Sequence, residues 1–511
     1  MFNLGKVVSK MESNVISVGQ IYKNNYKPEK TAILFKDTKF TFVELDDKVR
    51  AFANFLKGKG VTKGDKVMLD EGNSPEFLFS YLGTVRNAAV IVPINPMLTL
   101  EELKYIASDS EAKYLIINEG VTQKEGYSKE ALEQELGLTV FVLNEEMRAE
   151  IENAPREDYD MITDMKELST LLYTSGTTGR PKAAMLTHYN LVANSWQSKV
   201  AFETTEDDIF MCVLPIFHVF AFTAAILVPL FVGGTVDIVE SFQPKVVVNN
   251  LLHNKISVFL GVPAMYIVLT EEAKKSVKFP DLRLAISGGA ALPVEVYHQA
   301  KETFDIPIAE GYGLTESSPV SIVNPPSGIQ KPGSIGVTLP EVECIIADEN
   351  DCEVPTGEIG EILMKGPNIM SGYYNRPEET AETLRNGWLH TGDIAKRDED
   401  GYIYIVDRKK DIVNVAGLNI YPREIEEVLY KHPKIKDAAV VGVKDNLRGE
   451  AVTAYIVLKE GAEAYPREIL RWLKTLLANF KIPRHLIIVE SLPRNSSGKI
   501  LKRMLRENTD F

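Results

Sequence analysis

The chain has 511 residues, which is too long for one ordinary hydrophobic core and predicts two or more domains. Its composition, 45% hydrophobic and 25% charged, is typical of a globular protein, and its net charge of −14 argues against broad nucleic-acid binding and against a basic membrane-surface protein. The three cysteines (Cys212, Cys344 and Cys352) form no CxxC pattern or disulfide framework, and no histidines join them at zinc spacing, which favours a reducing, cytoplasmic location.

The N-terminal part of the chain predicts short buried strands alternating with amphipathic helices. The stretch FTFVELDDKVRAFANFLKGKG, residues 40–60, predicts the end of a strand and then a helix that ends at glycine. Two further runs, DKVMLD (65–70) and NAAVIVPINP (87–96), predict buried strands. The polar and acidic residues 144–166 predict a surface connection to the next strand.

The next predicted strand leads into a loop of hydroxyls, glycines and cations, YTSGTTGRPKAAMLTH (173–188), and a helix is predicted after it. Hydroxyls and backbone N–H groups donate hydrogen bonds, and glycine lets the backbone approach an anion closely. A glycine loop between strand and helix is typical of phosphate binding in α/β proteins. The sequence Arg180-Pro181-Lys182 after the second glycine does not fit a Walker loop. The alternative is a flexible surface loop rich in Ser, Thr and Gly.

One apolar stretch, IFMCVLPIFHVFAFTAAILVPLFV (209–232), is long enough to cross a bilayer. Pro215 and Pro229 interrupt it, His218 lies inside it, and neither Lys nor Arg flanks it closely. These features favour a buried strand, a loop and a buried helix over a membrane span.

Three strand–turn units follow: KISVFLGVP (255–263), LRLAISGGAALP (282–293) and IPIAEGYGL (306–314). Each strand ends in a turn of small residues, which predicts an α/β architecture with ligand loops at the strand ends. Residues 333–406 change to short strands and turns, and after them comes a small α+β unit. The fold prediction is therefore a large N-terminal α/β domain with a β-rich subdomain (residues 1–407) and a small C-terminal α+β domain (408–511), which the family resemblance described below implies is mobile.

Seven motifs occur in one order over almost the whole chain: YTSGTTGRPK, LPIFHVFA, SGGAAL, EGYGLTES, GWLHTGD, DRKKDIVNVAGLNIYP and PRNSSGKILK. Together they resemble the adenylate-forming superfamily of acyl-CoA synthetases, luciferases and peptide-synthetase adenylation domains. Within it, the chain most resembles fatty acyl-CoA synthetases. The resemblance implies a reaction in which a carboxylate attacks the α-phosphate of ATP and the thiol of coenzyme A then displaces AMP. It also implies Mg²⁺, a hard cation suited to carboxylate and phosphate oxygens.

The resemblance implies a nucleotide site built from five motifs. The β- and γ-phosphates are expected at Thr174, Ser175, Gly176, Thr177, Thr178, Gly179 and Lys182. The adenine pocket is expected at Gly289, Ala290, Ala291, Glu310, Gly311, Tyr312 and Gly313, with Tyr312 stacked on the base. Asp393 would accept the ribose hydroxyls, Arg408 would contact the nucleotide, Thr315 would meet the α-phosphate, and Glu316 would hold Mg²⁺.

The resemblance assigns the two chemical steps to different faces of the small domain. Lys499, on a loop of serines and glycine, would stabilise the adenylation transition state. The domain would then turn about a hinge at Lys410, and Gly417 would let the backbone lie close to the pantetheine tunnel. Without the resemblance, Lys499 reads as an exposed tail lysine and Gly417 as a hairpin glycine.

His218 resembles the family histidine beside the acyl carboxylate, and Val219, Phe220, Ala221 and Phe222 beside it are apolar. No acidic anchor for an amino group stands there, so a medium- or long-chain fatty acid is expected. The alternatives are a fatty-acyl-AMP ligase that loads a carrier protein, a ligase for a coumarate-like aryl acid, and, outside the enzymes, a degenerate binding module or a membrane-associated acyl carrier. A homodimer and a peripheral membrane contact remain open as further partners, and no nucleic acid or transmembrane segment is expected.

Overall fold

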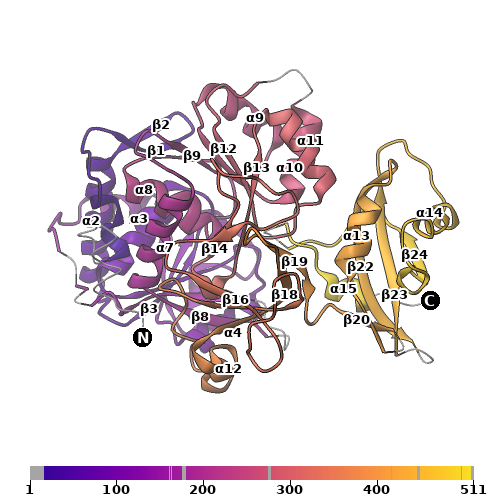
Figure 1. Ribbon diagram of the computed structural model, residues 1–511. Helices are drawn as coiled ribbons and strands as arrows, with labels where there is room; N and C mark the ends of the chain where they lie inside the picture. Colours follow the sequence, from indigo (N-terminus) through magenta and orange to yellow (C-terminus); the bar gives the residue numbers. More distant parts are fainter. Residues whose placement is uncertain are drawn as a thin grey trace.

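The computed structural model describes residues 17–159, 161–162, 164–174, 180–273, 278–415, 417–445, 449–495 and 498–507. Figure 1 shows a large body and, beside it, a smaller yellow lobe that contains the last strands and helices of the chain. We call this smaller part the C-terminal lobe; it runs from β20 (Val413–Val415) to α15 (Lys502–Glu507). The predicted division into a large α/β part and a small C-terminal part is confirmed.

A six-stranded sheet forms from the N-terminal part in the order β6-β5-β3-β4-β7-β8, and it is parallel except for β8, which pairs antiparallel with β7. Its strands are β3 (Lys66–Asp70), β4 (Val90–Pro93), β5 (Tyr114–Asn118), β6 (Thr139–Leu143), β7 (Leu168–Thr174) and β8 (Lys182–Thr187). The helices of this part are α2 (Phe42–Gly58), α3 (Pro75–Arg86), α4 (Leu100–Ser110), α5 (Lys129–Leu136) and α6 (Glu145–Glu152). The last of these lies in residues 144–166, which the sequence predicts only as a connection. A short, mostly exposed helix forms there instead, because the Asn144 side chain caps its first turn.

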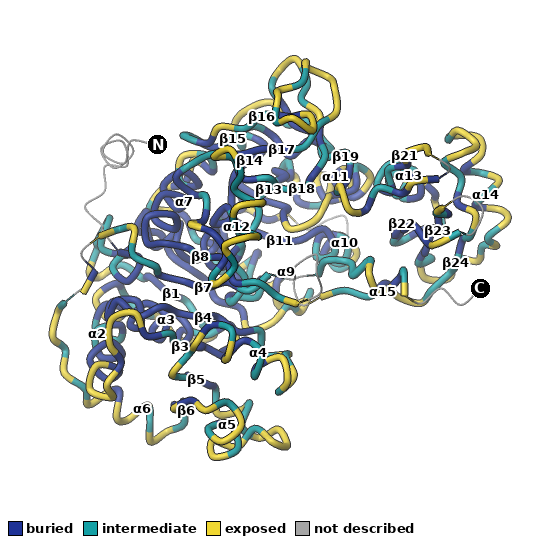
Figure 2. The backbone as a smooth tube through the Cα atoms, turned by 90° about the horizontal axis from the view of Figure 1, so that it is seen from below, coloured by how far each residue is buried: buried dark blue, intermediate teal, exposed yellow. Residues whose placement is uncertain are grey.

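A nine-stranded sheet has the order β15-β14-β13-β12-β11-β9-β10-β1-β2, with parallel pairing from β13 to β1. Its strands are β1 (Thr31–Phe35), β2 (Thr38–Thr41), β9 (Ile209–Cys212), β10 (Thr235–Ile238), β11 (Val258–Gly261), β12 (Leu284–Ser287), β13 (Ile308–Gly313), β14 (Val320–Val323) and β15 (Val337–Thr338). Its helices include α7 (His188–Ala201), α9 (Pro244–His253), α10 (Pro263–Glu272) and α11 (Val294–Phe304). Figure 2 shows that burial concentrates in the strands and in α3 and α7.

The apolar stretch 209–232 lies inside this body. It forms the buried strand β9, a turn, the π-helix η3 (Phe220–Leu227) and the buried helix α8 (Val228–Val232), which confirms the predicted strand, loop and helix. Within the described part of the chain, no helix has the length and apolar character needed to span a membrane. The π-helix is the unexpected feature, since such wide turns are rare and often mark functional sites.

The β-rich part and the C-terminal lobe complete the fold. A four-stranded antiparallel sheet contains β16 (Glu343–Ala347), β17 (Gly360–Lys365), β18 (Leu389–Arg397) and β19 (Ile403–Arg408), with α12 (Pro377–Thr383) between β17 and β18. The C-terminal lobe has a five-stranded sheet of β20, β21 (Leu418–Ile420), β22 (Ile435–Asp445), β23 (Gly449–Leu458) and β24 (His485–Ile488), with α13 (Pro422–Tyr430), α14 (Pro466–Leu473) and α15.

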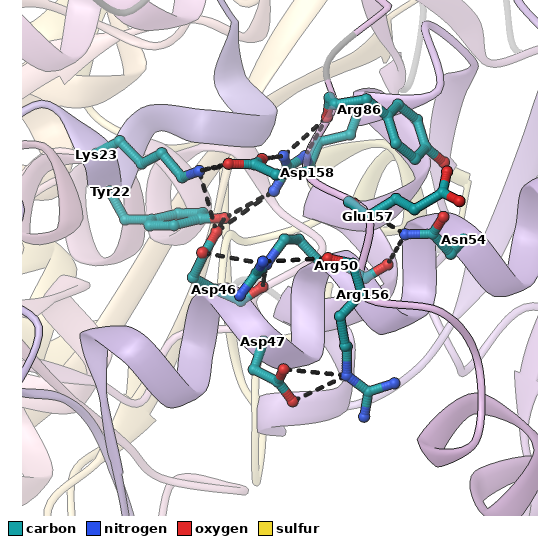
Figure 3. A network of polar contacts seen from close by, with 11 residues as sticks. Tyr22, Lys23, Asp46, Asp47, Arg50, Asn54, Arg86, Arg156, Glu157 and Asp158 are labelled. Atoms are coloured by element: carbon teal, nitrogen blue, oxygen red, sulfur yellow. Dashed lines mark hydrogen bonds and ion pairs between the residues drawn. The ribbon is translucent and has the colours of Figure 1, made fainter.

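A buried charge network ties the N-terminal elements together (Figure 3). The Arg86 side chain, at the end of α3, is fully buried, and its guanidinium donates to the hydroxyl of Tyr22, to the carboxylates of Asp46 and Asp158, and to the Tyr159 carbonyl. These partners come from η1 (Val18–Lys23), α2 and the connection that precedes β7. A buried guanidinium requires such partners, because an unpaired charge in the interior costs several kcal/mol, on the order of 3–5.

Candidate active site

A cavity of about 990 Å³ lies where the large sheets, the β-rich sheet and the C-terminal lobe meet. The ends of β7, β12 and β13 and the segment that follows β9 border it, together with residues of β18, β19 and the loop that carries Lys499. Ligand sites in open α/β sheets form at the carboxyl ends of parallel strands, and the position of this cavity agrees with that rule.

One wall of the cavity carries a tyrosine, an aspartate and an arginine in contact. Asp393 and Arg408 are cross-strand partners in β18 and β19, and Arg408 Nε lies 3.1 Å from Asp393 Oδ1. The hydroxyl of Tyr312, from β13, donates to Asp393 Oδ2 at 2.6 Å. Burial, reinforced by the Asp393 charge, raises the pKa of Tyr312 well above its usual value, so the phenol stays neutral. The three predicted residues are thus brought together.

A second wall contains the ends of the hydroxyl and glycine loop. Thr174 and Lys182 are register partners in the β7–β8 pair, and both border the cavity, while residues 175–179 between them lie outside the described residues. Lys182 Nζ lies 4.1 Å from the centre of the Tyr373 ring, and the Tyr373 hydroxyl donates to Glu316 Oε1 at 2.7 Å. Thr315 and Glu316 border the same region from the short helix η4 (Thr315–Ser317). A cation, a carboxylate and hydroxyls therefore face one space.

Lys499 reaches the cavity from the C-terminal lobe. Its loop closes on itself: the Lys499 N–H donates to Asn495 Oδ1 at 2.9 Å, and Gly498 has φ +81°, which favours glycine. A Cβ added to Gly498 would lie 3.1 Å from Val262 Cγ2, a cavity residue, so the loop is seated against the cavity wall. Burial and the nearby cations, Arg408 foremost, lower the pKa of Lys499 to about 7.

His218 lies at the apolar end of the cavity, just before η3. Burial and the charge of Lys499 lower its pKa to about 4, so the imidazole is neutral at pH 7. Its Nδ1 accepts the backbone N–H of Phe220 at 3.2 Å, and an accepting nitrogen carries no proton. The proton of the neutral ring is therefore on Nε2, which makes His218 a hydrogen-bond donor.

The remaining predicted residues divide into two groups. Gly289, Gly311 and Gly313 border the cavity. Ala290, Ala291, Glu310 and Gly417 are not among its lining residues. The two alanines are exposed, Glu310 is buried and accepts the Gly333 N–H at 2.8 Å, and Gly417 lies in the β20–β21 turn with φ +87°.

Sequence reasoning did not identify Tyr373, which contacts both Lys182 and Glu316. Gly372-Tyr373 stands in a connecting segment where a turn is also expected, and its partner Glu316 is 57 positions away. The only local signal is an aromatic residue after glycine, which ordinary turns share. The contact arises because the segment from Ser371 to Tyr374 runs beside β8, as its backbone bonds to Met185 and Ala183 show.

Known proteins resemble this chain over almost its whole length. Residues 22–374 match the family of AMP-binding enzymes, and residues 424–499 match the AMP-binding enzyme C-terminal domain. A long-chain-fatty-acid–CoA ligase from Bacillus subtilis is 36% identical over 94% of this chain and 92% of its own length. A feruloyl-CoA synthase from an Amycolatopsis species is also 36% identical, over 94% of this chain and 96% of its own length.

The crystal structures of MatB from Rhodopseudomonas palustris add information on shape. Both the ATP-bound and the apo structure are 33% identical and cover 96% of this chain and 98% of their own, but the TM-score is 0.91 for the ATP-bound form and 0.79 for the apo form. The overall shape of this chain is therefore closer to that of the ATP-bound form than to that of the apo form. From its sequence, its fold and its relatives, the chain belongs to the AMP-binding enzyme family of the adenylate-forming superfamily and is an acid–thiol ligase.

Proposed function

We propose that this ligase activates a medium- or long-chain fatty acid with ATP as an acyl-adenylate and then transfers the acyl group to coenzyme A. The observation that carries the proposal is the meeting of Lys499 with the Asp393–Arg408 pair and with His218 in one cavity. Relatives named long-chain-fatty-acid–CoA ligases support the choice of acid. A carboxylate is a poor electrophile, and adenylation turns its oxygen into a good leaving group.

In the first step, a carboxylate oxygen attacks the α-phosphorus of ATP, and the bond to pyrophosphate breaks. Tyr312 would stack on the adenine, and Asp393 would accept the ribose hydroxyls while Arg408 holds its carboxylate in place. Thr315 would meet the α-phosphate, and the loop from Thr174 to Lys182 would hold the β- and γ-phosphates. The Lys499 ammonium would stabilise the charge that develops on the reacting oxygens.

The second wall of the cavity, which contains Lys182, Thr315 and Glu316, also fits Mg²⁺. No set of three or more His, Cys, Asp or Glu side chains in the described part of the chain forms a metal cage. Mg²⁺ does not need one, because it is usually bound by one or two carboxylates together with substrate phosphates. Glu316, which borders the cavity, would hold the ion beside the phosphates, and the ion would neutralise part of their charge.

The apolar end of the cavity suits a hydrocarbon chain. Its wall is formed by Phe217, Val219, Phe220, Val262 and Ile286. The Nε2–H of His218 would donate to the carboxylate of the acid and so orient it toward the α-phosphate. Apolar walls with one placed donor are the usual design of a small-molecule pocket.

In the second step, the thiolate of coenzyme A attacks the acyl carbon and AMP leaves. We place the domain boundary at residue 407, with a mobile domain of residues 408–511 that carries both Lys499 and Gly417. Lys499 is in the cavity here and Gly417 is outside it. For the second step, the domain would turn and bring the Gly417 turn to the adenylate, which separates two incompatible sets of contacts.

An aryl acid is the second candidate substrate. The feruloyl-CoA synthase relative is as similar in identity as the fatty acid ligase, and Phe220 could stack on an aromatic ring as well as it lines a hydrocarbon chain. Loading of a carrier protein is the third candidate, and it would use the same first step.

The test is acid-dependent ATP–pyrophosphate exchange with acids from acetate to oleate, together with coumarate, ferulate and amino acids. We expect exchange to peak at a medium- or long-chain fatty acid and coenzyme A to cause release of AMP. A peak at coumarate or ferulate would replace the fatty acid by an aryl acid. Exchange without any effect of coenzyme A would favour carrier loading, and no exchange with any acid would overturn the proposal.

A further inference from the structure

Helix α11 begins directly after a turn that borders the cavity. β12 ends at Ser287, Gly288 and Gly289 line the cavity, and the helix starts at Val294. The first N–H groups of a helix have no acceptor within the helix. Pro293 occupies the N-cap and provides no side-chain hydrogen bond, so the acceptor must be water or a group from another part of the chain.

The C-terminal lobe supplies this acceptor. Glu427 Oε2, from α13, accepts the Val294 N–H at 3.4 Å, and Figure 1 shows α13 on the side of the lobe that faces α10 and α11. A carboxylate is the favoured partner there, since the N-terminus of a helix carries partial positive charge. The contact therefore joins the mobile lobe to the element that follows the cavity turn.

Arg423 holds Glu427 from within its own lobe. Its Nε lies 4.0 Å from Glu427 Oε1, one helical turn away, and its Nη1 donates to the Ile405 carbonyl at 2.9 Å. Burial raises the pKa of Glu310, in the large body, to about 7, and the charge of Arg423 opposes this rise. The guanidinium charge thus acts on one carboxyl from each side of the boundary.

A second charged contact between the C-terminal lobe and the large body, near α10, is weaker in kind. Lys436 Nζ lies 3.4 Å from Glu271 Oε2, but these side chains are 36% and 58% exposed. An exposed pair of long side chains contributes little, because water screens it and both chains lose freedom. The Glu427 contact differs from this pair because its donor is the backbone N–H of Val294, which the helix holds in place.

We propose that Glu427 is a positioning residue for adenylation, which caps α11 across the lobe boundary and so holds the C-terminal lobe in the arrangement that brings Lys499 into the cavity. The inference rests on the proposed function, because it takes Lys499 to act in the first step and to leave for the second. Water can replace Glu427 at the Val294 N–H when the lobe turns away. The contact therefore biases the lobe toward one arrangement without fixing it there.

The test compares Glu427→Gln, Glu427→Ala and Glu427→Lys in the full chain. Loss of a helix cap predicts a fall of about fivefold in ATP–pyrophosphate exchange for Glu427→Ala. The fall should be smaller for Glu427→Gln, which keeps an oxygen acceptor, and larger for Glu427→Lys, which puts a cation at the positive end of α11. Formation of thioester from supplied acyl-adenylate and coenzyme A should stay at the unaltered rate.

Glu424→Ala is the matched control. Glu424 is on the same helix and carries the same charge, but its carboxylate accepts from Lys481 of its own lobe at 2.6 Å, so exchange should be unchanged. Equal losses in both half-reactions, or no loss in either, would overturn the role of Glu427. Absence of exchange in the unaltered protein, with every acid, would instead overturn the proposed function and with it the step that Glu427 serves.

Discussion

Lys499 enters a cavity that already contains Arg408 and Lys410, and this environment makes its charge depend on pH near neutrality. Burial and the neighbouring cations lower its pKa to about 7, whereas the bound phosphates of ATP would favour the charged form and raise the pKa again. Because kcat/KM reports the free enzyme and kcat the substrate complex, the two should respond differently to pH.

The pH profile of ATP–pyrophosphate exchange tests this statement. The ammonium is the useful form and its fraction falls as pH rises through about 7, so kcat/KM for ATP should fall above that pH while kcat falls only at higher pH. Lys499→Arg, whose side chain stays charged, should be slower but should lack the alkaline fall. A wild-type kcat/KM that is flat from pH 6 to 9 would contradict the assignment, as would an unchanged fall in Lys499→Arg.

Individual site residues were predictable where a motif names the residue type and its chemistry does not depend on a distant partner. Asp393, Arg408 and Tyr312 were named from the sequence, and they meet in the cavity wall. Tyr373 was not, because its role comes from a contact with Glu316 that only the folded chain creates. The side toward which Glu310 points was not readable from the EGYGLTES motif either.

The contact between η3 and the end of β12 sets the shape of the apolar pocket. A Cβ added to Gly288 would lie 2.9 Å from Phe220 Cζ, so the phenyl ring rests directly on the glycine. Both residues line the cavity. The sequence predicted the strand, the turn and the helix of the 209–232 stretch, but an α-helix and a π-helix have the same apolar pattern when buried on all sides. The wide turn that places Phe220 is therefore a finding of the structure.

Changing this contact should change which acids are accepted. Phe220→Ala enlarges the pocket and should favour longer or bulkier acids, and Gly288→Ala pushes the ring into the cavity and should favour shorter ones. We expect the ratio of kcat/KM between a long and a short acid to move by about tenfold in opposite directions, the size of effect that a methylene group has in an apolar pocket. The KM for ATP serves as internal control and should stay constant. An unchanged ratio in both variants would contradict this role of the contact.

The large body is held together by charge as well as by apolar packing. Arg86 joins η1, α2, α3 and the connection to β7 through contacts that are buried or partly buried (Figure 3). That connection leads into the strand that carries Thr174. The network therefore stabilises, from a position outside the cavity, the segment that leads to Thr174 and the second cavity wall.

Arg86→Met should lower the free energy of unfolding by about 3 kcal/mol, since it leaves the buried Asp46 with fewer partners. The comparison is Lys48→Met, which removes an exposed pair with Glu152 between α2 and α6 and should cost less than about 1 kcal/mol. Urea unfolding of the two variants measures the difference. Similar midpoints for both would show that the buried network adds no more than a surface pair.

The division of the whole chain was predictable, because composition and turn density change between the α/β part, the β-rich part and the end of the chain. The relative placement of these parts was not. It depends on contacts such as Glu427 to Val294, and no local pattern indicates which side of α13 meets another lobe. Resemblance supplied the expectation of a mobile small domain, and the packing shows where it touches.

Val262 has two contacts: it lines the cavity, at the end proposed for the acid, and it packs against Gly498, the residue before Lys499. An acid that displaces Val262 therefore also disturbs the seat of the lysine. Discrimination between acids should then appear in the rate of acyl-adenylate formation and not only in the affinity for the acid. An ill-fitting acid can remain bound and still fail to consume ATP, which would spare the cell a futile cleavage.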